Sequence, residues 1–226
     1  MERTILMETT LGEQIMLLSL DDTTGAAALQ PQSEFMISSA SVLELALAGR
    51  IRLEDGRVLV NDPAPLGIPV LDAALAAIAA AKQPEDAQAW IFRLKQEAVE
   101  GARQGLLEKG VIREERTRRW GIFPVNRYPE ADGTVEEGVR AKLAAAVLEG
   151  GQPDDRTAAL ISLLHGGGLE SLLFTDRQDR EPIRARMAEL SENHWSEPVM
   201  KQLVDSVLVG LAGYAATTVA AVNTGN

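Results

Sequence analysis

The sequence predicts a mostly α-helical protein of one domain, with a helical bundle core surrounded by amphipathic helices and small β-hairpins. Hydrophobic residues make up 46% of the chain but aromatic residues only 4%, so Leu, Ala, Val and Ile must fill the interior. Alanine-rich runs favour closely packed helices, because Ala has the highest helix propensity. No Pro-, Gly- or Ser-rich linker divides the 226 residues, which suffice for one large core. We expect one domain over residues 1–226, with residues 1–13 less ordered.

Charge and composition exclude several classes of function. The net charge is −11, so the long-range field repels nucleic acid and anionic lipid, and either ligand requires a local basic patch. The absence of cysteine excludes disulfides and thiolate nucleophiles, and two isolated histidines do not form a zinc-binding pattern. No secretion signal opens the chain, and no window reaches the roughly 20 apolar residues of a membrane span. We expect a cytoplasmic, soluble protein without metal or cofactor.

The first elements follow from apolar spacing and turn residues. An apolar run in residues 14–29 ends in a turn at Asp21–Gly25, because Asp and Thr bond their own backbone and Gly accepts positive φ. A serine cap predicts a helix over residues 38–51 that stops at Gly49. Next, Asp55-Gly56 lies between alternating apolar residues, which is the strongest short-range signal for a β-hairpin.

Three helices are predicted next, over residues 69–82, 83–97 and 98–112. Pro84 is placed at the start of the second, and Gly110 ends the third. The first carries an apolar stripe at helical spacing, which predicts its buried face. The residues of that stripe are Val70, Ala73, Ala74, Ala77, Ile78 and Ala81.

The second half repeats the arrangement of a helix followed by a hairpin, now over residues 111–129, which is the local geometry of a winged helix. A helix over residues 132–151 follows, capped at Asp132 or Thr134. An amphipathic helix is predicted over residues 180–194. A long apolar helix over residues 196–222, broken at Gly210 or Gly213, is expected at the centre of the fold or in a subunit contact.

His165 is the first candidate for chemistry. It ends an apolar helix and is followed by three glycines. Loops that bind phosphate precede a helix, where N–H groups are free, so these glycines predict a C-cap and hinge. Catalysis by His165 requires a nucleophile or an orienting acid within reach, and the sequence indicates neither. We expect a structural role.

Arginines provide the candidates for anion binding. Arg156 lies near the positive end of a helix and either pairs with a carboxylate or binds an anion. The only dense basic cluster contains Arg113, Arg116, Arg118 and Arg119 with Trp120, and Arg127 and Tyr128 follow a few residues later. Guanidinium groups bind phosphate in a forked geometry, and Trp favours a water–membrane boundary. The alternative is a solvated hairpin, partly neutralised by acidic neighbours. Arg50 is a secondary candidate.

Seven short motifs together carry a family resemblance. They are "LLSLDDTTG", "LELALAGRI", "DPAPLGIPVLDAAL", "AWIFRL", "LLEKGVI", "RTAALISLLH" and a following "GL". In this order and spacing, from about Gln14 to Val222, the chain resembles the Golgi phosphoprotein 3 family and looks like a bacterial-type member. The resemblance implies one mostly helical domain without catalytic activity. Eukaryotic members are peripheral membrane proteins that bind phosphatidylinositol 4-phosphate, insert an apolar hairpin into the bilayer, recruit glycosyltransferase tails and can self-associate.

The residues of the family's lipid pocket are not retained here. Its Trp and three Arg correspond to Leu29, Ser38, Gln152 and Asp155, and a carboxylate at the last position repels phosphate. The resemblance places the membrane-contact loop after the three glycines. Its apolar residues here are Leu169, Leu172, Leu173 and Phe174.

These observations lead to three hypotheses of function. The first is a non-enzymatic peripheral membrane or adaptor protein that binds anionic head groups or membrane-protein tails. The second is a protein–protein scaffold or homo-oligomer without lipid binding, with the helix over residues 196–222 as its contact. The third and least favoured is a winged-helix nucleic-acid binder, because the net charge opposes it.

Overall fold

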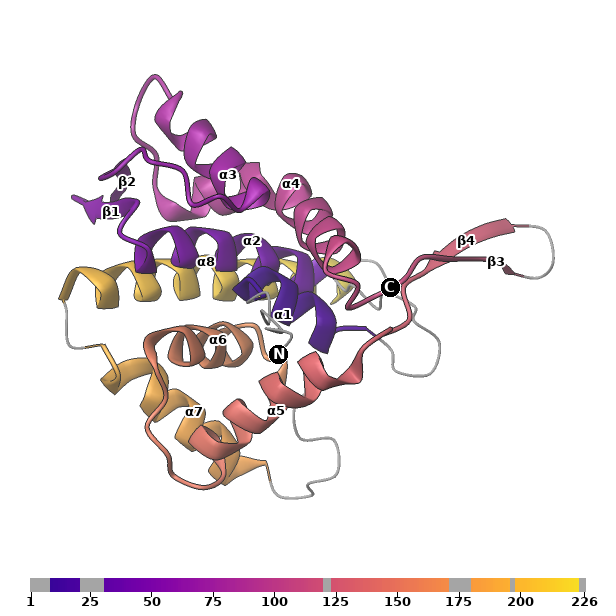
Figure 1. The fold of residues 1–226 in the computed structure, drawn as a ribbon. Helices are drawn as coiled ribbons and strands as arrows, with labels where there is room; N and C mark the ends of the chain where they lie inside the picture. Colours follow the sequence, from indigo (N-terminus) through magenta and orange to yellow (C-terminus); the bar gives the residue numbers. More distant parts are fainter. Residues whose placement is uncertain (1–8, 21–30, 120–122, 171–179, 196–197, 224–226) are drawn as a thin grey trace, which may run out of the picture.

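The computed structural model describes residues 9–20, 31–119, 123–170, 180–195 and 198–223 (Figure 1). Within these ranges it is mostly helical, with two antiparallel hairpins, and the predicted single-domain α-helical class is confirmed. The helices are α1 (Leu11–Leu18), α2 (Pro31–Leu47), α3 (Pro69–Ala79), α4 (Ala87–Glu108), α5 (Gly133–Val147), α6 (Asp155–Gly166), α7 (Glu181–Asn193) and α8 (Pro198–Asn223). The strands are β1 (Ile51–Glu54), β2 (Arg57–Val60), β3 (Glu115–Arg119) and β4 (Phe123–Arg127).

Helix α2 is the centre of the core. It packs against α1, α4, α6 and α8, and residues 35–45 are all buried. Figure 1 shows α2 and α8 running side by side through the middle of the molecule, with α3 and α4 on one side and α5, α6 and α7 on the other. Helices far apart in sequence thus share one apolar interior. This agrees with the absence of a Pro-, Gly- or Ser-rich linker from the sequence.

Residues 9–13 belong to the structured start of α1. Thr10 caps α1 by accepting a hydrogen bond from the Glu13 N–H, and the Glu13 carboxylate accepts one from the Thr10 N–H. This reciprocal capping box satisfies two donors at the helix start. Leu11 and Glu13 are buried. Part of the segment expected to be less ordered, residues 9–13, thus forms a capped and buried helix start, and residues 1–8 lie outside the described residues.

Helix α2 begins at Pro31, seven residues before the predicted serine cap. Ser38 instead lies inside the helix and is fully buried, and its Oγ donates to the Ile91 carbonyl of α4 at 2.7 Å. Ser41 donates to the carbonyl of Ile37, one turn back. Ser38 thus joins α2 to α4, whereas Ser41 satisfies its donor within its own helix, so the prediction of a serine cap at this position was wrong.

Residues 87–108 form one helix, not the end of one and the start of another. Its N-cap is Asp86, two residues after Pro84, and accepts from the Ala89 N–H at 2.8 Å. Gly101 and Gly105, which weaken the helical pattern, serve contacts with neighbouring helices. A Cβ on Gly101 would lie 2.5 Å from Val70 of α3, and one on Gly105 would lie 2.0 Å from the Glu13 carboxylate of α1.

The buried face of α3 is rotated from the predicted stripe. Leu71, Ala74, Leu75 and Ile78 are buried. Ala73 and Ala77 are exposed, whereas Val70 and Ala81 are half-buried. The branched side chains therefore occupy the core, and a line of alanines faces away from it.

Both hairpins are present where predicted. In the first, Asp55 (φ 49°) and Gly56 (φ 74°) form a two-residue turn between Glu54 and Arg57, which pair across the strands. Positive φ at both positions is what this turn requires. Each hairpin directly follows a helix, α2 or α4, as predicted.

The caps of the later helices are also as predicted. Asp132 caps α5 and Asp154 caps α6, each by accepting from a backbone N–H of a threonine. Hydrogen bonds from the threonine side chain, and then from its backbone N–H, lower the pKa of both carboxyls because they stabilise the charged form. In α7, Ile183, Met187 and Leu190 are buried, which confirms its amphipathic character.

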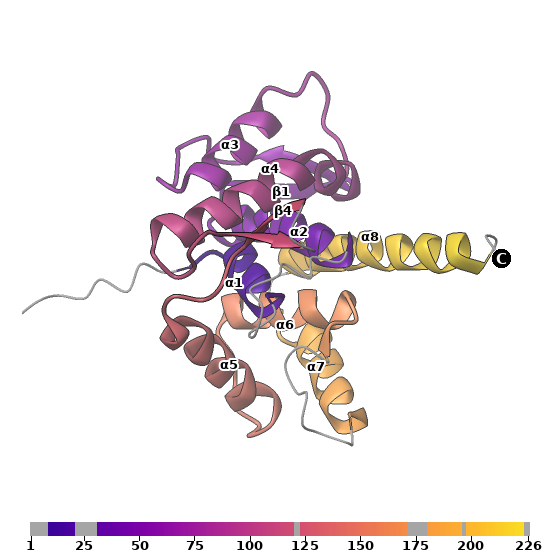
Figure 2. The ribbon, with the colours of Figure 1, turned by 90° about the vertical axis from the view of Figure 1, so that its right-hand side faces the viewer.

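Helix α8 is not broken at Gly210 or Gly213 but continues from Pro198 to Asn223. Leu203, Val204 and Val207 are fully buried against the core. Figure 2 shows the C-terminal part of the same helix extending well beyond the rest of the molecule. No helix in the described part of the chain is long and apolar enough to cross a bilayer.

Candidate functional site

The hairpin of β3 and β4 carries most of the arginines predicted to bind anions. We call residues 113–127 the basic hairpin. Figure 1 shows its strands extending away from the helical body. The register pairs Arg118 with Pro124 and Arg119 with Phe123. The side chains of these two arginines and the whole of Trp120 lie outside what the structure describes.

The remaining arginines of the basic hairpin differ in their pairing. Arg113 pairs with Glu115, with 2.9 Å between Nε and Oε1, and both are exposed. Arg116 is exposed and Arg127 half-buried, and neither forms an ion pair with the described residues. The hairpin is therefore only partly neutralised by its own acids.

The base of the basic hairpin is attached firmly to α4. Arg103 donates to the Tyr128 hydroxyl at 2.8 Å, and its guanidinium lies 5.3 Å from the centre of the Tyr128 ring. Tyr128 is buried. The Arg113 N–H donates to the Pro129 carbonyl at 3.0 Å, and Ile112 forms a bridge with Glu130. These contacts fix the direction in which the hairpin leaves the body.

Arg156 faces the protein interior. Its guanidinium pairs with Glu44 of α2 and donates to the Thr9 carbonyl at 2.7 Å. Glu44 is 4% exposed and its second oxygen accepts from the Leu11 N–H at 2.9 Å. Of the two sequence alternatives for Arg156, the ion pair is confirmed. Its forked donor set is occupied by protein oxygens.

A second buried pair adjoins the first. Glu13 is 2% exposed and pairs with Lys109, at the end of α4. Burial raises the pKa of Glu44, Arg156 and the Leu11 N–H lower it, and the nearby Glu13 carboxylate raises it again. The net shift is upward. We call Glu13, Glu44, Lys109 and Arg156 the ionic cluster. It joins α1, α2, α4 and α6 at one point.

The other predicted contacts are scattered. Arg50 pairs with Asp62 beside the first hairpin. Leu169 is half-buried and packs on the core, whereas Leu172, Leu173 and Phe174 lie outside the described residues. Of the four positions of the family's lipid pocket, Leu29 is also outside them.

The remaining three pocket positions do not present a phosphate site. Ser38 is buried against α4, and Gln152 is exposed. Asp155 is exposed, and its carboxylate oxygen Oδ1 lies 2.8 Å from Nε2 of His194, from which it accepts a hydrogen bond when that nitrogen is protonated.

His165 and the glycines after it are structural. Its Nδ1 lies 3.1 Å from a Glu170 oxygen at the end of α6. Gly167 is the C-cap, and Gly168 has φ of 67°. A Cβ on Gly167 would lie 1.9 Å from the Met36 sulfur, so the glycine lets α6 end against α2. Among the described residues, no group of three or more His, Asp or Glu could hold a metal ion.

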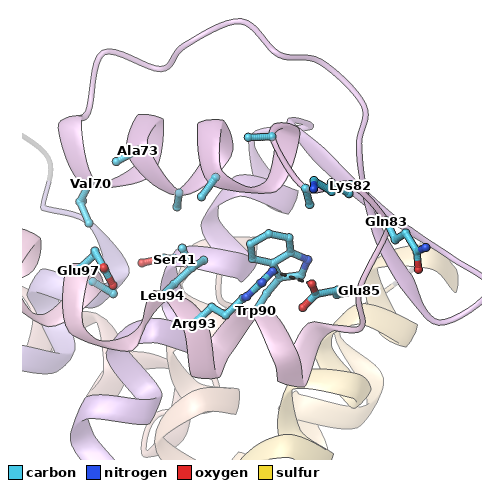
Figure 3. A pocket seen from close by; sticks show the side chains of 15 residues that line it. Ser41, Val70, Ala73, Lys82, Gln83, Glu85, Trp90, Arg93, Leu94 and Glu97 are labelled. Carbon is cyan, nitrogen blue, oxygen red and sulfur yellow. Dashed lines mark hydrogen bonds and ion pairs between the residues drawn. The ribbon is translucent and has the colours of Figure 1, made fainter.

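Sequence reasoning missed a cavity between α3 and α4 of about 840 Å³ (Figure 3). Alanines of α3 form one wall, and Trp90 and Leu94 of α4 form the other. Arg93 lies 5.3 Å from the centre of the Trp90 ring and pairs with Glu85 at 2.6 Å. The run of alanines was the available signal, but spacing alone assigned it to the core.

Comparison with known families agrees with this architecture. A family model described as Golgi phosphoprotein 3 (GPP34) matches residues 11–207, from the start of α1 into α8. The match spans the helical core, both hairpins and the ionic cluster, and the family is known as non-enzymatic. The chain therefore belongs to the Golgi phosphoprotein 3 family.

Proposed function

We propose that this protein is a non-enzymatic peripheral membrane protein that binds anionic phospholipid surfaces through the basic hairpin. The observation that carries the proposal is the position of the hairpin, which extends from the body with arginines at 116, 118, 119 and 127 (Figure 1). Within about 8 Å, the screening length at physiological salt, local charge outweighs the distant net charge of −11. The cytoplasmic leaflet, which is anionic, is the surface that fits.

The proposed recognition is of surface charge, not of one head group. The positions of the family's phosphoinositide pocket hold Ser38, Gln152 and Asp155, and Arg156 is committed to Glu44. Arginines on a protruding hairpin respond to the charge of a surface. They distinguish anionic from neutral lipid but do not distinguish one phosphorylated inositol head group from another. We therefore expect similar binding to vesicles of equal charge, whichever anionic lipid provides it.

Reversing two charges on the basic hairpin should abolish vesicle binding. Each basic residue near an anionic surface contributes about 1 kcal/mol, so the loss of two costs about 30-fold in affinity, and the new carboxylates add repulsion. Flotation of Arg118→Glu/Arg119→Glu with phosphatidylserine-containing vesicles measures the effect.

The matched control is Arg52→Glu/Arg57→Glu on the first hairpin, where both arginines are exposed. It changes the net charge equally and should retain most of the binding. Equal loss in both variants, or wild-type binding to neutral vesicles, would contradict the proposal.

Self-association through α8 is a second candidate. The C-terminal part of α8 extends past the body (Figure 2), and Val209, near the middle of the helix, is 70% exposed. An apolar helix surface of this kind is stabilised when a second copy covers it. We expect Val209→Glu to shift an oligomer toward monomer in sedimentation velocity. A monomeric wild-type protein across the accessible concentrations would end this candidate.

Nucleic-acid binding has the weakest support. In a winged helix, a helix next to the hairpin enters the major groove. Here α2, which precedes the first hairpin, is buried through residues 35–45 and has no free face for a groove. The net charge of −11 adds repulsion from phosphate.

A further inference from the structure

The cavity between α3 and α4 has no part in the membrane binding proposed for the basic hairpin. Its volume of about 840 Å³ lies in the range of small-molecule binding sites. It adjoins a second hollow of about 1010 Å³, and the two share Val70 and Glu97 as lining residues. Together they form one trough along α4.

One wall of the trough is an apolar surface left uncovered by the fold. Ala73 and Ala77 belong to a stripe spaced like a buried helix face, yet both are exposed and line the cavity. Figure 3 shows Val70 and Ala73 of α3 on one side of the space and Leu94 and Trp90 of α4 on the other. Small side chains along one wall leave a long, narrow apolar space, which suits an extended chain better than a bulky ligand.

The two ends of the cavity differ in charge. Figure 3 shows Val70 and Glu97 at one end and Lys82, Gln83 and Glu85 at the other. The Glu85 carboxylate is neutralised by Arg93. Lys82 is exposed and forms no ion pair within the described parts of the chain. The end with Lys82 therefore carries an uncompensated positive charge, whereas the other end carries Glu97.

A buried donor lies at the positive end. Trp90 is 2% exposed, and its indole Nε1 has no acceptor in the described structure. An unsatisfied buried donor costs free energy that an oxygen of a bound ligand would recover. In Figure 3 the edge of the indole that bears this nitrogen faces the end occupied by Lys82 and Glu85. The nitrogen is covered in the empty cavity, so contact requires a small turn of the ring or of a neighbouring exposed side chain.

From this juxtaposition we propose that the α3–α4 cavity binds a single-chain amphiphile with an anionic head, of the fatty-acid class. The hydrocarbon chain lies along the alanines of α3 toward Val70. The carboxylate lies at the other end, where it meets the Lys82 ammonium and accepts a hydrogen bond from Trp90 Nε1. This site is separate from the basic hairpin and does not depend on the function proposed above.

Calorimetric titration with dodecanoate, below its micelle concentration, tests the site. We expect saturable binding of one equivalent that weakens about fourfold for each methylene removed, in the series from dodecanoate to octanoate. Ala77→Leu fills the trough and should weaken binding at least tenfold. Ala76→Leu, at an exposed α3 position that does not line this cavity, should bind as the wild type does.

The head-group contacts are tested separately. Lys82→Gln should weaken dodecanoate binding about two- to fivefold, as expected for an exposed ion pair, and leave dodecanol binding unchanged. Trp90→Phe removes the donor, keeps an aromatic wall and should weaken dodecanoate binding about tenfold. Arg118→Glu/Arg119→Glu should bind dodecanoate normally, which distinguishes this site from the vesicle-binding surface.

Several results would overturn the assignment. They are the absence of saturable binding, an equal effect of Ala76→Leu and Ala77→Leu, or an affinity independent of chain length. Equal affinity of the wild type for dodecanoate and dodecanol would overturn the carboxylate assignment. Thermal midpoints of the free variants, measured in parallel, show whether each remains folded.

Discussion

Replacement of Arg156 by Met is expected to lower the free energy of unfolding by about 3 kcal/mol, because it leaves a buried carboxylate without its partner. Glu44 is 4% exposed, and Arg156 is its only ion-pair partner among the described residues. The lost bond to the Thr9 carbonyl also loosens the start of α1. Urea unfolding followed by circular dichroism measures the change. For comparison, Arg52→Met breaks an exposed pair with Glu54 and should cost less than about 1 kcal/mol.

The loss of unfolding free energy caused by Arg156→Met should depend on pH in a defined direction. Burial already raises the pKa of Glu44 in the native state, and removing Arg156 raises it further. A carboxyl with a raised native pKa binds more protons folded than unfolded, so stability falls as pH rises from the unfolded pKa to the native one. The variant should therefore be closest to wild type near pH 5 and furthest from it at pH 7.5. An equal or larger deficit at pH 5 would contradict this account.

Neutralising the carboxylate should reverse part of the loss. Glu44→Gln keeps an acceptor for the Leu11 N–H and leaves Arg156 a third exposed, where water can solvate it. Its cost should be smaller than that of Arg156→Met. The double variant Glu44→Gln/Arg156→Met should be more stable than Arg156→Met alone, because no buried charge remains. A double-mutant cycle isolates this coupling.

The second large effect is expected at Gly101. Within a helix, Gly→Ala normally stabilises by about 1 kcal/mol. At Gly101 of α4 the new Cβ would lie 2.5 Å from Val70 Cγ2 and 2.6 Å from its Cβ. Val70 is β-branched and cannot turn away, so α3 must shift, and overpacking of this kind costs about 1 to 3 kcal/mol. We expect Gly101→Ala to lower the unfolding midpoint in urea.

Gly138 provides the matched control for Gly101. It lies inside α5, and a Cβ placed on it meets no atom within 4 Å. The same substitution there should raise stability by about 0.5 to 1 kcal/mol, since only the helix preference changes. Stabilisation of both variants would show that α3 and α4 separate easily, and the close-contact argument would then fail.

The sequence determined the local elements of this protein. The Asp55-Gly56 turn, the Asp132 and Asp154 caps and the positive φ of Gly168 after α6 are set by the dihedral preferences and short hydrogen bonds of neighbouring residues. These interactions act within three or four positions, so spacing along the chain reveals them. The motifs that carry the family resemblance, spread over nearly the whole chain, indicated the same architecture.

Only the tertiary structure decided the length of α2, the continuity of α4 and the partners of the buried charges. Glu44 and Arg156 are 112 residues apart, and Glu13 and Lys109 are 96 apart. Glycines at 101 and 105 weaken a helical pattern locally, yet they remain helical because α3 and α1 approach the backbone there. The alanines of α3 match a core pattern, but whether a helix face is covered depends on how far away the next helix packs. Such contacts join residues that have no local influence on one another, and packing free energy, not chain-local preference, selects them.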